Sequence, residues 1–332
     1  MRTRSKNPHQ QITILPVEIL LLIFKWIHPG KALLYKRLCR RINTVLEDPR
    51  FATTSLVHWI PSGSAELPLT QSRKRVDLDT IWLKWPLLFQ SAYITRKFAR
   101  LTHFIWREDR GLFHNPLPLC ITKIQTLTHL ILPRNNMIGP IPDPIYSLVH
   151  LSVLHLSSNR LTGPLSPLVQ QLTNLVTLNL EHNYLDGSIP SEIGFCSNLT
   201  KLSLDYNDFS GSIPAFLSQC TRLECIELGY NNLSGRIPQE ICTSLSQLET
   251  LKLRTNQLSG EIPAEIGELR ALQEIYLQEN LLSGMIPVEI KSLQSLVLVG
   301  LLDGNPLMER KLPSGVERGT LIYEVLKRDG FE

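Results

Sequence analysis

Tyrosine, acidic and basic side chains recur at a fixed spacing in the central part of this chain of 332 residues. Tyr206 and Tyr230 lie one sequence period apart, and carboxylates flank the pair. Tyrosine combines a large contact area and a low entropic cost with a hydroxyl group, so such a pair is suited to binding a protein ligand. An ordinary solvated surface is the alternative interpretation of the same residues.

The sequence lacks the spacings on which common catalytic sites depend. It has no glycine-rich phosphate loop, no His-Glu-x-x-His pair, no zinc-ligand spacing and no nucleophile elbow. His129, His155 and His182 stand at different offsets, so they do not align into a metal-ligand set. We therefore predict a binding protein that is not an enzyme and that needs neither a metal nor a cofactor.

The tyrosines belong to a repeat that runs from Leu127 to Leu307 with a period of 24 or 25 residues. One copy, from Leu175 to Pro190, has the pattern L-x-x-L-x-L-x-x-N-x-L-x-G-x-I-P. A period of this length is typical of a stacked solenoid in which each coil buries its leucines against its neighbours. The asparagine of the pattern recurs at Asn135, Asn159, Asn183, Asn207, Asn231, Asn256, Asn280 and Asn305.

Each copy predicts a short strand, because leucines two residues apart, such as Leu178 and Leu180, lie on one face. The asparagine that follows can donate and accept hydrogen bonds, so we expect a ladder of these side chains that satisfies backbone groups inside the coils. Residues that flank the buried leucines should form the concave surface. The predicted substrate-binding residues there are Glu181, Asp205, Tyr206, Glu227, Tyr230, Lys252, Arg254 and Tyr276.

The repeat resembles the plant-type leucine-rich repeat, which is marked by Gly-x-Ile-Pro at Gly139, Gly187, Gly211, Gly235, Gly260 and Gly284. The resemblance implies an α/β fold: a right-handed leucine-rich-repeat solenoid of about eight repeats plus a degenerate first one, over residues 101–309. Leu101, Phe104 and Trp106 would form the degenerate repeat. An amphipathic segment at 310–332 is expected to cap the C-terminal end.

A different pattern precedes the repeats. Residues 1–11 are polar and basic without periodicity, which predicts a disordered tail. Residues 12–52 carry apolar residues at helical spacing, then Leu38-Cys-Arg-Arg and Glu47-Asp-Pro, and together these motifs resemble an F-box, a small all-α module. A plain helical hairpin that caps the solenoid is the alternative. Residues 53–100 are predicted to form a packed connector and N-terminal cap.

The F-box resemblance implies a substrate-recognition subunit of a cullin-RING (SCF-type) ubiquitin ligase. A Skp-type adaptor and the cullin complex would bind the helical module, and the solenoid would present an unknown protein substrate. The alternative is a leucine-rich-repeat scaffold or ligand-binding protein, receptor-ectodomain-like or inhibitor-like, with no ubiquitin role. By resemblance, the adaptor contact maps to Leu15, Pro16, Ile19, Leu20, Ile23, Phe24 and Leu38.

The charge distribution and the cysteines indicate the partners and the cellular compartment of the protein. Residues 1–110 hold 19 Lys and Arg against 8 Asp and Glu, a net +11, whereas 111–332 hold 15 against 22, a net −7. The two halves are thus expected to meet different partners. The six cysteines form no paired cluster, and Cys196 and Cys220 are predicted to be buried thiols. We expect an intracellular protein, cytoplasmic or nuclear, without membrane or nucleic-acid partners.

Overall fold

A computed structural model describes residues 92, 94, 95, 98, 100–105 and 116–331. The predicted tail, the F-box-like module with its adaptor-binding residues, and most of the predicted connector lie outside these residues. The chain divides into two compact units, of which the first comprises Met1–Leu101 with Pro118–Thr126 and the second comprises Thr102–Leu117 with Leu127–Glu332. In the described part of the first unit, Ile94 and Ile124 are fully buried and a 3-10 helix, η3, spans Leu119–Lys123.

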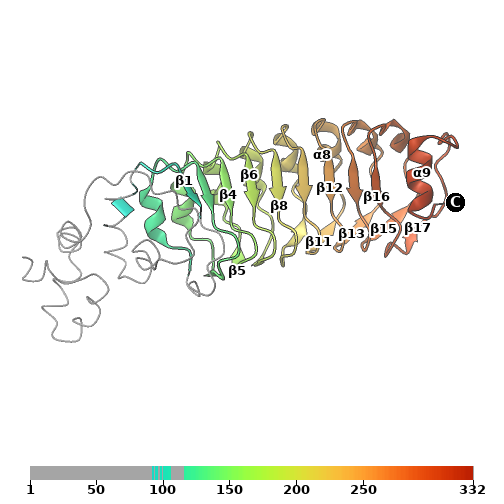
Figure 1. The fold of residues 1–332 in the computed structure, drawn as a ribbon. Helices are drawn as coiled ribbons and strands as arrows, with labels where there is room; N and C mark the ends of the chain where they lie inside the picture. The colour runs from blue at the N-terminus through green and yellow to red at the C-terminus, as the bar shows by residue number, and fades with distance from the viewer. Residues whose placement is uncertain (1–91, 93, 96–97, 99, 106–115, 332) are drawn as a thin grey trace, which may run out of the picture. The chain divides into compact units, whose positions relative to one another are not determined.

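The second unit is a stack of coils whose strands form a long parallel sheet (Figure 1). Each strand pairs in register with the equivalent residues of the next coil, as Leu178 does with Leu202 and Leu202 with Ile226. The middle residue of the strand is buried in each of these cases. Within the described residues the sheet contains, in order, β1 (His103–Ile105), β2 (His129–Ile131), β4 (Val153–His155), β6 (Thr177–Asn179), β8 (Lys201–Ser203), β10 (Cys225–Glu227), β12 (Thr250–Lys252), β14 (Glu274–Tyr276) and β16 (Leu298–Gly300).

Shorter parallel sheets form where the Gly-x-Ile-Pro motifs stand. The glycine of the motif adopts the left-handed backbone region, for example φ 71° at Gly187, where an added Cβ would also crowd Pro164. The first of these sheets contains β3 (Ile138–Gly139), β5 (Arg160–Pro164) and β7 (Tyr184–Asp186). The second contains β9 (Ser210–Ser212), β11 (Asn232–Gly235), β13 (Gln257–Gly260), β15 (Leu281–Gly284) and β17 (Leu307–Met308).

A short helix completes most coils, and it begins directly after a proline or serine that closes the preceding motif. Proline fits this position because its ring fixes φ, which is −68° at Pro190. Its missing N–H costs nothing here, since the residue before a helix does not need to donate a helical hydrogen bond. The coil between Asn231 and Asn256 forms an α-helix, α8 (Gln239–Ser244), whereas the other helices described in the array are 3-10 helices. The 3-10 helices are η4 (Asp143–Ser147), η5 (Pro167–Gln171), η6 (Ser191–Phe195), η7 (Ala215–Gln219), η8 (Ala264–Glu268) and η9 (Val288–Ser292).

The repeat asparagines connect neighbouring coils through the backbone, as their chemistry predicts. The amide nitrogen of Asn207 donates to the carbonyl oxygens of Leu204 in its own coil and of Leu180 in the preceding coil, both at 3.0 Å. Its amide oxygen accepts a hydrogen bond from the backbone N–H of Leu185 at 3.0 Å. The ladder therefore consists of amide-to-backbone bonds, and the loss of one amide would leave buried groups unpaired at a cost of about 1–3 kcal/mol.

The ends of the array match the sequence pattern where it is described. Phe104 is buried and β1 pairs with β2, so the degenerate first repeat contributes a strand, whereas Trp106 lies outside the described residues. At the other end, α9 (Leu321–Arg328) is capped by Thr320, whose hydroxyl accepts a hydrogen bond from the N–H of Tyr323. Its buried residues are Ile322, Val325 and Leu326.

The cysteines of the second unit are free thiols. Cys196 and Cys220 are both fully buried and unpaired, as the sequence predicts. Burial, together with the neighbouring Cys196, raises the pKa of the Cys220 thiol to about 12, so it stays protonated and unreactive. In the part of the chain that the structure describes, no helix is long and apolar enough to cross a membrane.

Candidate binding surface

The predicted substrate-binding residues lie on neighbouring coils, from the coil of β6 to the coil of β14. They flank the buried leucines of the strands, and we call the surface that they form the strand face. Because the strands pair in register, side chains at one offset lie side by side on adjacent coils. The structure therefore brings these residues into one region, and it gives them different contacts.

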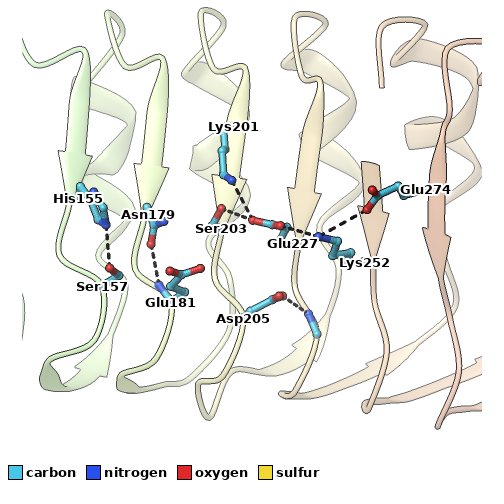
Figure 2. A network of polar contacts seen from close by, with 11 residues as sticks. His155, Ser157, Asn179, Glu181, Lys201, Ser203, Asp205, Glu227, Lys252 and Glu274 are labelled. Carbon is cyan, nitrogen blue, oxygen red and sulfur yellow. Dashed lines mark hydrogen bonds and ion pairs between the residues drawn. The ribbon is translucent and has the colours of Figure 1, made fainter. Parts of the chain in front are cut away.

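Glu227 is the centre of an ion-pair network that crosses four strands (Figure 2). Its carboxylate lies 3.2 Å from the ammonium of Lys201 and 3.0 Å from that of Lys252. Lys252 also lies 3.7 Å from the carboxylate of Glu274, and the Ser203 hydroxyl donates to Glu227 at 2.6 Å. Sequence reasoning missed Lys201, Ser203 and Glu274 as parts of this network.

Burial raises the pKa of the Glu227 carboxyl, but the hydrogen bonds from Ser203 and Lys252 and the charges of Lys201 and Lys252 outweigh burial and bring it to about 2. Glu227 is therefore ionised at neutral pH, and its charge is satisfied by its neighbours. The network holds adjacent strands together, so Glu227 and Lys252 have less capacity left for a ligand than exposed, unpaired charges would have.

The Asp205 side chain contacts the backbone of the next coil. One carboxylate oxygen accepts a hydrogen bond from the N–H of Gly229, and the residue is only 8% exposed (Figure 2). Burial raises the pKa of this carboxyl to about 7, against the opposing effect of the Gly229 hydrogen bond. Asp205 thus satisfies a backbone donor inside the strand face and presents little surface to a partner.

Four predicted residues and His182 contribute to a stack of planar groups, which we call the aromatic column: His182, Tyr206, Tyr230, Arg254 and Tyr276. The His182 and Tyr206 ring centroids lie 4.1 Å apart, and those of Tyr206 and Tyr230 lie 4.0 Å apart, with nearly parallel planes. The Arg254 guanidinium lies 4.7 Å from the Tyr230 centroid and 5.8 Å from that of Tyr276. The sequence predicted the Tyr206 and Tyr230 pair, and the structure confirms that they are adjacent.

The backbone explains why these rings stack. His182, Tyr206 and Tyr230 all adopt the left-handed region, at φ 53°, 55° and 52°. The N–H groups of His182 and Tyr206 each donate to a carbonyl of the following coil, at 2.9 and 3.0 Å. Every coil therefore repeats the same Cα–Cβ direction. Sequence reasoning compared His182 with other histidines, whereas the informative signal was its shared offset with the tyrosines.

Arg254 is the permanently charged group of the aromatic column. Its Nε is buried and has no hydrogen-bond partner among the described residues. Its side chain is half-buried between the two tyrosine rings, which favours a cation–π interaction. Glu181, on the coil of β6, is also half-exposed. The strand face thus offers partly exposed tyrosine side chains, a guanidinium and a carboxylate over five coils.

A separate groove of about 580 Å³ lies on the flank of the coils, near β7 and β9. It contains none of the predicted site residues, and Glu192 is its only ionisable residue. Among the described residues, no group of three or more His, Cys, Asp or Glu side chains is placed to hold a metal ion. The strand face is therefore the better candidate for a functional surface.

The repeated strand, the amide ladder and the parallel sheet define an α/β leucine-rich-repeat solenoid. A family model described as leucine rich repeat matches residues 221–282, and another with the same description matches 150–172, 174–196 and 198–220. The chain thus carries leucine-rich repeats, which confirms the repeat part of the sequence interpretation. A comparison with curated proteins gave no match.

Solved structures similar to this chain include plant receptor ectodomains. The leucine-rich-repeat ectodomain of the Arabidopsis thaliana receptor kinase GASSHO1/SCHENGEN3, solved with CASPARIAN STRIP INTEGRITY FACTOR 2, is 38% identical, with a TM-score of 0.57. The match covers 60% of this chain and 24% of that chain. The Arabidopsis receptor kinase HAESA, solved with the peptide hormone IDA and the co-receptor SERK1, is 29% identical, with a TM-score of 0.60 and coverage of 68% and 40%.

The likeness extends beyond plants. The Leptospira interrogans leucine-rich-repeat protein LIC12759 is 31% identical, with a TM-score of 0.55, and the match covers 70% of this chain and 55% of that chain. The present chain thus spans only about a quarter to about a half of the length of these three proteins. The matching family models describe repeats alone, so the F-box part of the sequence interpretation has no support from them.

Proposed function

We propose that the strand face binds an extended segment of a protein or peptide ligand along the aromatic column, and that the chain acts by binding and not by catalysis. The observation that carries this proposal is the continuous stack from His182 to Tyr276. The peptide hormone in the complex of the similar plant receptor HAESA supports it. This function corresponds to the scaffold or ligand-binding alternative of the sequence interpretation.

The column is ordered before any ligand arrives. Its rings are held by their neighbours and by the left-handed backbone, so binding immobilises few side chains and loses little entropy. Stacked rings cover each other's faces, and Tyr206 remains 37% exposed. A ligand in an extended conformation can contact the exposed parts of these rings and the Arg254 guanidinium, whereas the ion-pair network holds the strands together.

The test is selection from a displayed library of random peptides on the wild-type protein. Each selected peptide is then measured against the double variant Tyr206→Ala/Tyr230→Ala. Because a hot-spot truncation costs about 2 kcal/mol or more, we expect binding to weaken by about 30-fold or more. The matched control is Phe195→Ala/Phe216→Ala, which removes two exposed aromatic residues at η6 and η7 and should leave binding unchanged. Equal binding to both double variants would refute the proposal.

A second candidate function is adaptor docking in a ubiquitin ligase. It rests on the resemblance of residues 12–52 to an F-box and on the net charge of +11 over residues 1–110, and it requires the intracellular location that the cysteines favour. Purified full-length chain should then capture a Skp-type adaptor, and Ile23→Asp/Phe24→Asp should abolish capture by placing charges in the apolar contact. The absence of capture by the wild-type chain would exclude this function and leave ligand binding in place.

A further inference from the structure

The aromatic column has an open end at His182. One face of the His182 ring is covered by Tyr206, and no described ring or guanidinium covers the other face. The equivalent residue of the preceding coil is Ser158, whose side chain is short, and the equivalent residue one coil earlier is Arg134. His182 is exposed, so the space over Ser158 lies open beside its ring.

Ser158 occupies the same backbone position as the stacked residues. Its φ is 55°, compared with 53° at His182 and 55° at Tyr206. Its N–H donates to the carbonyl of Glu181 at 2.8 Å, just as the N–H of His182 donates to that of Asp205 at 2.9 Å. A ring at position 158 would therefore project as the rings of the column do, and it would meet His182 at the same stacking distance.

The space over Ser158 has the thickness of one planar group. Parallel strands lie about 4.8 Å apart, so the coils of Arg134 and His182 are separated by roughly twice that distance. A ring in van der Waals contact needs about 3.5 Å on each face, so one ring fits between these coils and two do not. We call this space the Ser158 slot.

We propose that the Ser158 slot receives an aromatic side chain of the bound ligand, which stacks on His182 and extends the column by one ring. The proposal rests on the proposed function, since the ligand is the segment that binds the strand face. An aliphatic side chain would fit by size but would gain no ring stacking.

The proposal can be tested without the natural ligand. N-acetyl-tryptophanamide is titrated into the full-length protein, with N-acetyl-leucinamide as the aliphatic control, and the ring-proton resonances of His182 are followed by NMR. His182→Ala assigns these resonances. We expect saturable shifts with the tryptophan probe, and none with the leucine probe at equal concentration. No shift, or equal shifts with both probes, would overturn the proposal.

Two substitutions of Ser158 separate slot filling from a loss of structure. Ser158→Tyr fills the slot from within, so the tryptophan probe should bind at least tenfold more weakly, whereas Ser158→Ala leaves the slot open and should bind as the wild type does. Circular dichroism spectra of both variants establish that they fold. If Ser158→Tyr does not fold, His182→Ala removes the ring face instead and should reduce binding of the probe, measured by equilibrium dialysis, by the same factor. Wild-type affinity in the variant used would overturn the slot.

The peptides selected on the wild-type protein distinguish this proposal from the proposed function. If those peptides depend on Tyr206 and Tyr230 but bind Ser158→Tyr as tightly as the wild type, the slot is wrong and the binding function stands. If peptides bind the Tyr206→Ala/Tyr230→Ala variant unchanged while the tryptophan probe still requires an open slot, the binding function fails and His182 remains a stacking site.

Discussion

Two acidic residues of the strand face, Asp205 and Glu227, show how the same side-chain chemistry is used in opposite ways on neighbouring coils. Glu227 has two lysines and a serine hydroxyl around it, and its pKa falls to about 2. Asp205 has a single backbone donor within reach, and burial raises its pKa to about 7. The first carboxylate therefore stabilises the fold as an anion, whereas the second disfavours its own ionisation in the folded state.

The raised pKa of Asp205 makes its contribution to stability depend on pH. Because the folded pKa lies above the unfolded value of 3.8, the folded chain binds more protons between these values, and stability should fall as pH rises from about 4 to about 7. Asp205→Asn keeps an oxygen that can accept from Gly229 and removes the charge. We expect the variant to be more stable than the wild type by on the order of 1–3 kcal/mol at about pH 8, and nearly equal to it at about pH 4.

Urea denaturation followed by circular dichroism at both pH values measures this difference. Glu227→Gln is the matched control, since it is the same chemical change at a carboxyl whose pKa is lowered. Its effect should have the opposite sign, with stability lost at neutral pH and the difference from wild type fading as pH falls through about 2, the folded pKa. A stability difference for Asp205→Asn that does not change with pH would show that Asp205 is not protonated on folding.

At the scale of the element, each strand of the long sheet has only three residues, so its stability comes from its neighbours. Within one coil, Leu204 is fully buried, whereas Tyr206, two residues later, is 37% exposed and contacts the rings on either side. The first residue belongs to the core between coils. The second belongs to the binding surface, with part of its area covered by the aromatic column.

Leu204→Ala and Tyr206→Ala should therefore differ in their effect on the free energy of unfolding. The leucine deletion leaves a core cavity and should cost about 2–5 kcal/mol. The tyrosine deletion removes two ring contacts, at about 0.5–1.5 kcal/mol each at most, and leaves no cavity. Thermal denaturation of both variants measures the difference, with Tyr184→Ala, at a 57% exposed residue, as the reference for a surface change. Equal losses for Leu204 and Tyr206 would contradict the assignment of core and surface.

The sequence predicts the features that repeat with the period of the coils. It does not predict contacts that depend on how far and in which direction a side chain extends. The strand, the amide ladder and the adjacency of Tyr206 and Tyr230 all follow from residues at equal offsets, because the coils stack in register. Ser203, Glu227 and Lys252 also stand at equal offsets and pair in register, whereas the contacts of Lys201 with Glu227 and of Glu274 with Lys252 join different offsets and could not be predicted in this way. The burial of Asp205 was missed because its N–H partner, at Gly229, belongs to the backbone and has no sequence signal.

At the scale of the whole second unit, the coils contact their sequence neighbours, so stability is approximately a sum of coil and interface terms. β16 is the last strand of the long sheet. Without α9, the coil of β16 would have no neighbour to cover it. Leu326 of α9 is fully buried, and Asp329 accepts hydrogen bonds from the N–H groups of Leu301 and Leu302 at 2.8 and 3.2 Å. The helix thus satisfies both the apolar and the polar groups of the final coil.

Disrupting this cap should unfold the array from one end. Leu326→Asp places a charge in the buried contact, whereas Leu321→Asp makes the same change at a 53% exposed residue of the same helix. In native-state hydrogen exchange, we expect Leu326→Asp to accelerate exchange in β14 and β16 and to leave β6 and β8 protected, and Leu321→Asp to change neither. Local opening of this kind would leave the His182 and Tyr206 end of the aromatic column intact, so ligand binding there should persist in the capping variant. Uniform acceleration across all strands would instead show that the coils unfold as one cooperative unit, because in a nearest-neighbour array a lesion at the last coil cannot reach β6 without first opening the coils between them.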